Sequence, residues 1–179
     1  MKRTYRPGKL FGLELQITPS AIWSTLALWA ILTLVGWAGL KMAPGTAVLG
    51  GLLATFIHWD NELMHQLGHA WAARRTGYPM TGLRTWYLLS ASLYPRDEGS
   101  LPAEIHIRRA LGGPPVSIAL AILGGILVWL LPSGTLLYWL ALFFALENLF
   151  VFGLGAFVPL GFTDGSTLLT WWPRRGQTN

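Results

Sequence analysis

The stretch TAVLGGLLATFIHWDNELMHQLGHAWAARR, residues 46–75, changes character half-way along. Its first half is apolar, whereas its second half carries the polar side chains His58, Asp60, Asn61, Glu62, His65 and His69. At about 100° per residue, four of these side chains share one narrow face of a helix, and a fifth, Asn61, lies beside it. The four are His58, Glu62, His65 and His69. We therefore expect a helix over about residues 46–73 with a polar stripe along one side.

The stripe has two explanations. A hydrogen-bonded seam that packs the helix against its neighbours is the plainer one. Ionisable groups inside a membrane are costly, however, and by default they mark a functional site. If the helix crosses a membrane, the functional explanation is favoured.

The composition is that of a membrane protein. Of 179 residues, 53% are hydrophobic and only 12% are charged, about half the charged fraction of typical soluble domains. Three further stretches reach the ~20 residues that cross a bilayer, namely 20–40, 110–131 and 135–160, the last interrupted by Glu147. We expect one domain over residues 1–179, an all-α polytopic membrane protein with four transmembrane helices.

Lysine and arginine positions indicate the orientation. Twelve of the thirteen cations lie in the N-terminal arm, between the second and third spans, or in the tail, and only Lys41 lies on the other side. The positive-inside rule then predicts that both termini are cytoplasmic and that the lipid bilayer is a partner. Nucleic acid is not expected as a partner, because no basic stretch outside the spans is interleaved with base-stacking aromatic residues.

Short β-strands are expected at the cytoplasmic membrane surface. KLFGLELQI, residues 9–17, alternates apolar and polar side chains, which predicts a half-buried strand. TGLRTWYLLSASLY, residues 81–94, favours one or two short strands over a helix. Gly113-Pro114-Pro115 is expected to interrupt the third span near its cytoplasmic end.

His65 and His69 have the spacing of two metal ligands on one helical face. A catalytic zinc takes three protein ligands and a water. Asp164, in PLGFTDGSTLL, follows the fourth span at the depth of the two histidines and is the candidate third ligand. Its alternative role is to cap the short helix that begins after it.

Gln66 stands where the HExxH pattern of zinc hydrolases has a glutamate that accepts a proton. An amide orients a water but has no useful basicity. Three explanations are open: a substitution that traps substrate, a natural loss of activity, or a base located elsewhere. Glu62 is the nearest carboxylate, but it lies on the ligand face and suits a partner of the histidines, or an extra ligand, better than a base.

Four segments, in order, resemble the site-2 protease family of intramembrane zinc metalloproteases. GKLFGLELQITPS resembles the family's strand before the first span, and HQLGHAWAARRTGY resembles its HELGHAxAAxxxG motif. RRALGGPPVSIAL resembles its AGPxxN segment, and AFVPLGFTDGSTLL resembles its NxxPxxxLDG motif. Four residues depart from these patterns: Gln66 for Glu, Ser117 and Ala156 for Asn, and Thr163 for Leu.

The resemblance implies a site as well as a fold. It makes His65, His69 and Asp164 the zinc ligands and puts Gln66 at the position of the general base. It also implies that an unwound membrane-spanning substrate helix pairs with a strand over about residues 83–94. Substrate contacts are then expected at Leu83, Trp86, Tyr87 and Leu89, and further active-site candidates are Glu62, Asn61, His58 and Ser117.

The favoured function is hydrolysis of peptide bonds in membrane-spanning substrates, in a form that Gln66 leaves inactive or trapped. A non-catalytic membrane binding protein with the same fold is the main alternative. A metal or proton carrier, in which His58 and Glu147 act as stepping stones, is a third.

Overall fold

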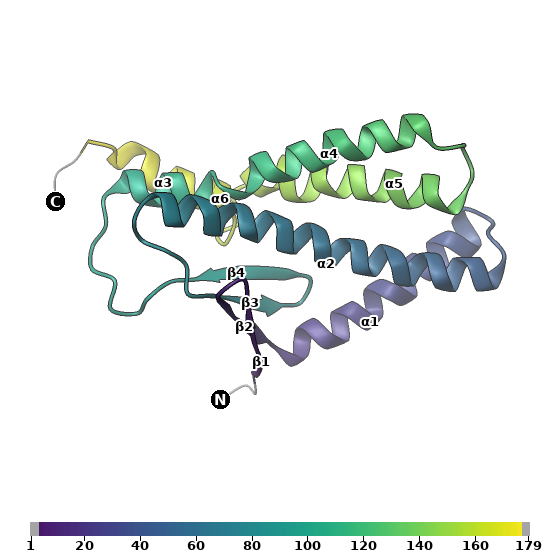
Figure 1. Ribbon diagram of the computed structural model, residues 1–179, viewed down its shortest axis with the longest axis horizontal. Coiled ribbons are helices and arrows are strands. Elements are labelled where there is room, and N and C mark those ends of the chain that lie inside the picture. Colours follow the sequence, from purple (N-terminus) through teal and green to yellow (C-terminus); the bar gives the residue numbers. More distant parts are fainter. Residues whose placement is uncertain (1–3, 177–179) are drawn as a thin grey trace.

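The computed structural model describes residues 4–176 and is mostly helical, with one small sheet (Figure 1). The α-helices are α1 Pro19–Leu34, α2 Pro44–Arg75, α3 Ala103–Ala110, α4 Gly113–Leu130, α5 Leu136–Glu147 and α6 Asp164–Trp171. Two π-helical segments, Val35–Gly39 and Asn148–Gly153, continue α1 and α5, and short 3-10 turns cover Gly155–Phe157 and Trp172–Arg174. In Figure 1, α2 runs through the middle of the molecule, with α4 and α5 on one side and α1 and the sheet on the other.

Three helical segments of the described residues are long and apolar enough to cross a membrane: Pro19–Gly39, Ala103–Leu130 and Leu136–Phe157. They match the first, third and fourth expected spans. The helix α2 is longer still, at 32 residues, but its polar stripe keeps it out of this group. Its passage across the membrane stays a prediction.

The segment Ala103–Leu130, which contains nearly all of the third expected span, is divided into two helices. The break falls at residues 111–112, between α3 and α4, and Pro114 and Pro115 then occupy the first turn of α4. Proline lacks a backbone N–H and is tolerated in the first turn, where no acceptor within the helix is needed. The expected interruption is therefore present, and it produces a short helix, α3, before the apolar run.

The sheet contains β1 Tyr5–Leu10, β2 Leu13–Ile17, β3 Gly82–Trp86 and β4 Leu89–Leu93, in the order β1-β2-β3-β4. The outer pairs are antiparallel and β2 is parallel to β3. One or two strands are expected within residues 81–94, and the structure has two, β3 and β4. The single strand expected over residues 9–17 is corrected, because the chain turns at Phe11 and Gly12, with φ of 50° and 84°. Positive φ at both central residues is what a two-residue hairpin turn of type I′ requires.

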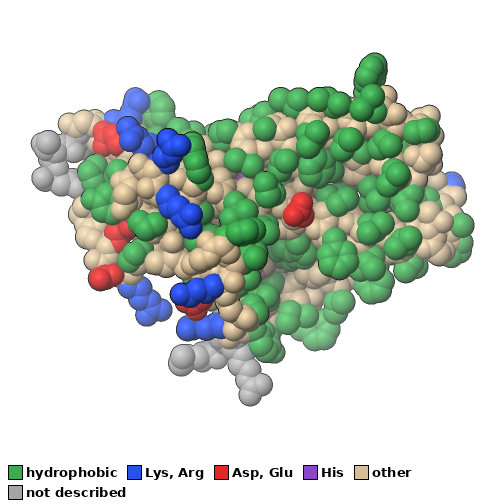
Figure 2. Space-filling model, in the orientation of Figure 1, with side chains coloured by type: hydrophobic (Ala, Val, Ile, Leu, Met, Phe, Trp, Pro, Cys, Tyr) green, Lys and Arg blue, Asp and Glu red, His purple; other side chains and the backbone are tan. Residues whose placement is uncertain are grey.

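Apolar and cationic side chains separate along the long axis of the molecule. Figure 2 shows apolar side chains over one half of the molecule, where α1, α2, α4 and α5 extend away from the sheet. Most Lys and Arg lie at the other end, with the sheet and α3. Trp23, Phe56 and Trp129 are 71%, 64% and 83% exposed. Lys2 and Arg3, two cations of the predicted cytoplasmic arm, lie outside the described residues. The side of the membrane on which the termini lie stays a prediction.

Candidate metal centre

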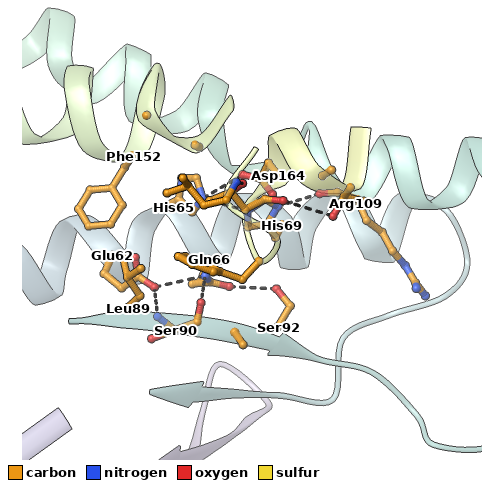
Figure 3. Close-up of a pocket in the computed structure, with 18 of the residues that line it drawn as sticks. Glu62, His65, Gln66, His69, Leu89, Ser90, Ser92, Arg109, Phe152 and Asp164 are labelled. Carbon is orange, nitrogen blue, oxygen red and sulfur yellow. Dashed lines mark hydrogen bonds and ion pairs between the residues drawn. The ribbon is translucent and has the colours of Figure 1, made fainter. Parts of the chain in front are cut away.

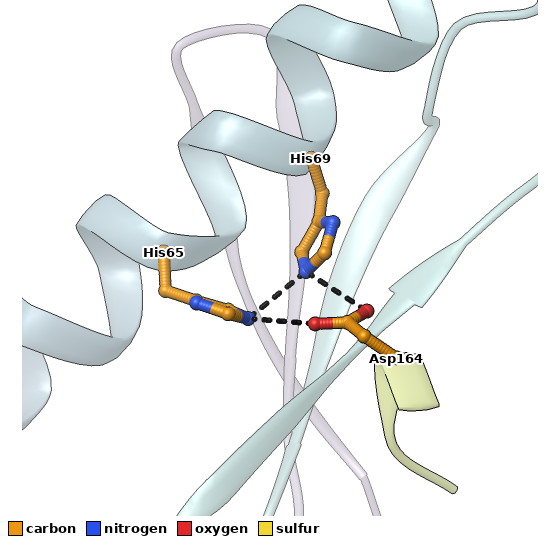
Figure 4. Close-up of side chains that lie close together, drawn as sticks. All are labelled: His65, His69 and Asp164. Atoms are coloured by element: carbon orange, nitrogen blue, oxygen red, sulfur yellow. Dashed lines mark hydrogen bonds and ion pairs between the residues drawn. The ribbon is translucent and has the colours of Figure 1, made fainter. Parts of the chain in front are cut away.

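Three potential ligands converge between α2 and α6. One helical turn brings His65 and His69 onto the same face of α2, with their Nε2 atoms 2.9 Å apart. Asp164 begins α6, and its carboxylate oxygens lie 3.4 Å from each of these nitrogens. All three ligand atoms lie within 4.8 Å of one another (Figure 4). The structure thus brings together the two histidines and the aspartate that the sequence pointed to.

Hydrogen bonds on the far side of the imidazoles turn Nε2 toward the centre. Nδ1 of His69 lies 2.7 Å from the Arg109 backbone carbonyl, which can only accept, so this nitrogen carries the hydrogen. Nδ1 of His65 lies 3.1 Å from the Ser117 hydroxyl. Neutral imidazoles oriented through Nδ1 offer an Nε2 lone pair, which is the usual arrangement of histidine ligands. Two such nitrogens and a carboxylate fit zinc.

Glycines allow α4 to begin directly against the two histidines. A Cβ on Gly113 would lie 2.5 Å from both the His65 and the His69 rings. A Cβ on Gly68 would meet the Gly112 carbonyl oxygen at 2.5 Å. Because only glycine fits at these contacts, α2 and α4 can approach closely enough for Ser117 to reach His65.

The centre opens into a cavity of about 730 Å³. Its walls come from α2, from β4 with its neighbours, from α3 and α6, and from the segment between residues 150 and 164. Aromatic side chains line much of it, including Trp86, Tyr94, Phe152 and Phe162. A cavity of this size, mostly apolar with a few convergent polar groups, is typical of a ligand-binding site.

Gln66 points from α2 toward β4 and uses both ends of its amide (Figure 3). Nε2 donates to the Ser90 carbonyl at 2.9 Å, and Oε1 accepts from the Ser92 hydroxyl at 3.0 Å. One turn earlier, Glu62 accepts the Ser90 N–H at 2.5 Å and faces the Gln66 amide at 3.3 Å. Both backbone groups of Ser90 are therefore bonded to side chains of α2.

The other predicted site residues lie in four different places. Trp86 and Leu89 line the cavity, as expected of substrate contacts. Tyr87 is 61% exposed in the β3–β4 turn and is not part of the cavity lining. Leu83 is a correction: it is 3% exposed and packs with Ala70 and Ala73 of α2, because alternate side chains of β3 face that helix. His58 and Asn61 contact Glu147 instead of the metal ligands.

Arg109 is a residue of the site that the sequence did not single out. Its carbonyl orients His69, and its guanidinium forms two bonds to Glu98, at 2.6 Å and 2.9 Å. It also lies over the Tyr94 ring, 3.9 Å from the centroid. Nothing in the run RRALGG distinguishes Arg109 from its neighbour Arg108, so only the three-dimensional arrangement identifies it.

Comparisons with known proteins agree with the metal-binding geometry. No family model matches this chain. A curated protein of Methanocaldococcus jannaschii, provisionally named a zinc metalloprotease, is 27% identical over 146 residues, or 73% of this chain and 75% of the relative. The solved structure of the site-2 protease from the same organism matches with a TM-score of 0.61 at 18% identity, over 93% of this chain and 70% of that one. The resemblance to the site-2 protease family is confirmed.

At 18% identity, the structural match to a site-2 protease shows that the fold is similar and no more than that. Together with the three apolar helical segments, that fold makes this chain a membrane protein.

Proposed function

We propose that this chain is a membrane metalloprotein of the site-2 protease type, with zinc held by His65, His69 and Asp164. The observation that carries the proposal is the convergence of these three ligand atoms within 4.8 Å at the wall of a large cavity. The zinc metalloprotease name of the curated relative supports the choice of metal. When bound, zinc supplies a Lewis acid that polarises a peptide carbonyl.

The substrate in this proposal is a membrane-spanning helix that unwinds and lies extended in the cavity. Trp86 and Leu89 provide apolar contacts along one wall, and β4 is the edge strand of the sheet beside it. An extended peptide can pair with such an edge through alternate backbone groups. At Ser90 these groups are bonded to Glu62 and Gln66, so a peptide must replace those bonds or pair beyond them.

Gln66, at the position of the general base, decides how much peptidase activity is expected. Its amide cannot take a proton, and loss of a general base typically costs about 10²–10⁴ in rate. Glu62 is held by the Ser90 N–H and by the Gln66 amide, which supports a role in holding β4 over a role as the base. We infer that this form is folded and zinc-loaded, with little or no peptidase activity.

A non-catalytic membrane binding protein is the second candidate, and one observation favours it. Gln66 donates to the Ser90 carbonyl, which a carboxylate cannot do, and accepts from Ser92. The surroundings thus match an amide at this position. Ala156 also offers no hydrogen bond where the related motif has asparagine. The carrier hypothesis has less support, because among the described residues His58 and Glu147 bond to each other and not to the ligands.

Replacing Gln66 by glutamate separates these functions. If the metal centre is hydrolytic, Gln66→Glu should raise cleavage of a helical membrane substrate by about 10²–10⁴, with zinc content unchanged. Equal cleavage by both forms, abolished by Glu62→Gln, would make Glu62 the base. Absence of cleavage in both forms, with substrate still captured, would favour the binding protein.

A further inference from the structure

A second buried polar group lies in the helical bundle, apart from the metal centre. His58 of α2 and Glu147 of α5 are joined by a 2.7 Å contact between Nδ1 and Oε1, and their side chains are 5% and 9% exposed. Asn61, fully buried, donates to the other carboxylate oxygen of Glu147 at 2.7 Å. On its other side, Nε2 of His58 lies 3.0 Å from the backbone carbonyl of Leu88.

The hydrogen bonds determine how many hydrogens the group holds. The Leu88 carbonyl only accepts, so His58 Nε2 carries a hydrogen. The contact between His58 Nδ1 and Glu147 Oε1 needs one more, held by either atom. The pair is then an imidazolium with a carboxylate or an imidazole with a carboxylic acid, and both have zero net charge. This accounts for a glutamate in an apolar helix, where an unpaired charge would be costly.

Leu88 connects this group to the cavity wall. It belongs to the two-residue turn between β3 and β4, and the residues on either side of that turn, Trp86 and Leu89, line the cavity. Figure 1 shows the hairpin lying along α2. The position of the turn therefore sets where these two side chains stand.

The helix and the strand are matched in spacing. His58, Glu62 and Gln66 are one turn apart on α2, about 6 Å per step. His58 bonds to Leu88, and Glu62 bonds to Ser90. Gln66 bonds to both Ser90 and Ser92. Two strand residues span about 6.6 Å, so successive turns of α2 meet alternate residues of the hairpin. His58 makes the outermost of these contacts.

We propose that His58, Asn61 and Glu147 are positioning residues that tether the β3–β4 turn, through α2, to α5. The tether holds Trp86 and Leu89 at the cavity wall. It acts on the shape of the cavity and not on the metal ligands, so it stands whether or not the centre cleaves peptides.

The absence of cysteine from the chain makes a direct test practical. A nitroxide on Tyr87→Cys, in the exposed turn, reports the motion of the hairpin in the full-length protein by its electron paramagnetic resonance spectrum. His58→Leu and Glu147→Leu should each shorten the rotational correlation time of the label severalfold, which sharpens the spectrum. Glu147→Gln should keep the spectrum of the parent, because glutamine can accept from Asn61 and donate to a neutral His58 that still holds Leu88.

Two controls separate the tether from a general loss of packing. Thr55→Val removes a buried hydroxyl of α2 that bonds only within its own helix, and it should leave the spectrum unchanged. A label on Phe11→Cys, in the turn of the other hairpin, should not respond to His58→Leu. If single variants fail to fold, the paired variant His58→Leu with Glu147→Leu removes both ionisable partners together and is the one to measure.

The outcomes are distinct. An unchanged Tyr87→Cys spectrum in His58→Leu or in the paired variant would overturn the proposal, and so would equal loosening at Tyr87→Cys and Phe11→Cys. Zinc content should stay at the parent level in every variant, because none changes a ligand. A protein without zinc would contradict the proposed function but leave the spectra free to test the tether.

Discussion

Gly113 shows how much of the metal centre depends on a residue that binds nothing. Its missing side chain leaves the space in which the His65 and His69 rings lie, since a Cβ there would come within 2.6 Å of both rings. The ligand pair could be predicted from its spacing in the sequence. The need for glycine at this position could not, because it arises from the approach of α4 to α2.

Gly113→Ala should therefore lower zinc affinity although it alters no ligand. The added methyl group meets ring atoms that the backbone of α2 holds in place, so at least one imidazole must turn away. Titration of the apoprotein with zinc measures the effect. Gly125→Ala is the matched control, because it lies on the same helix with nothing within 4 Å of the added Cβ. Equal zinc affinity in both variants would contradict this account of the site.

Predictability from sequence falls as contacts become longer in range. The apolar runs predict α1, α4 and α5 because length and hydrophobicity are local properties. The turn at Phe11 was missed because a bulky residue with positive φ carries no glycine- or asparagine-like signal at its position. Glu147 was recognised as unusual, but its partner His58 lies 89 positions away, and only the packing of α5 on α2 brings them together.

An ion pair of Glu98 with Arg109 joins the segment between β4 and α3 to α3. The bidentate guanidinium holds the pKa of the Glu98 carboxyl below its usual range. A carboxyl whose pKa is lowered by folding stabilises the folded state above its unfolded pKa. That stabilisation is lost as the pH falls through the lower, folded pKa.

Glu98→Gln should accordingly destabilise the protein near neutral pH and make less difference in acid. Thermal unfolding of both forms in detergent, from neutral pH to below the ordinary pKa of glutamate, measures the difference. The two curves should converge as the pH falls. A difference that stays constant, or that grows in acid, would show that the ion pair does not supply the pH dependence.

At the scale of the whole molecule, the cations are gathered at one end. The connection that contains Lys41 lies at the opposite end, beyond the apolar half (Figure 2). By the positive-inside rule, the cationic end is expected on the cytoplasmic side. We propose four spans, with α2 as the second and both termini on the cytoplasmic side.

Reporter fusions test this topology. One reporter after Arg175 and one within residues 43–45 should lie on opposite sides of the membrane. Residues 43–45 lie where the connection from α1 enters α2, and α1 separates that connection from the N-terminal arm, which is expected on the same side as the C-terminus. Fusion after residue 100 should agree with the fusion after Arg175. Reports from the same side at residues 43–45 and after Arg175 would contradict the topology, even if the fold is right.

The central claim is that His65, His69 and Asp164 together bind zinc, and metal content measures it most directly. Elemental analysis of the purified full-length protein should find about one zinc per chain, as expected for a site of three protein ligands and a water. His69→Ala and Asp164→Asn should each lose most of it. His106→Ala, which removes a histidine outside the ligand set, should retain it. Zinc that persists in His69→Ala and Asp164→Asn at the level of the parent would contradict the account.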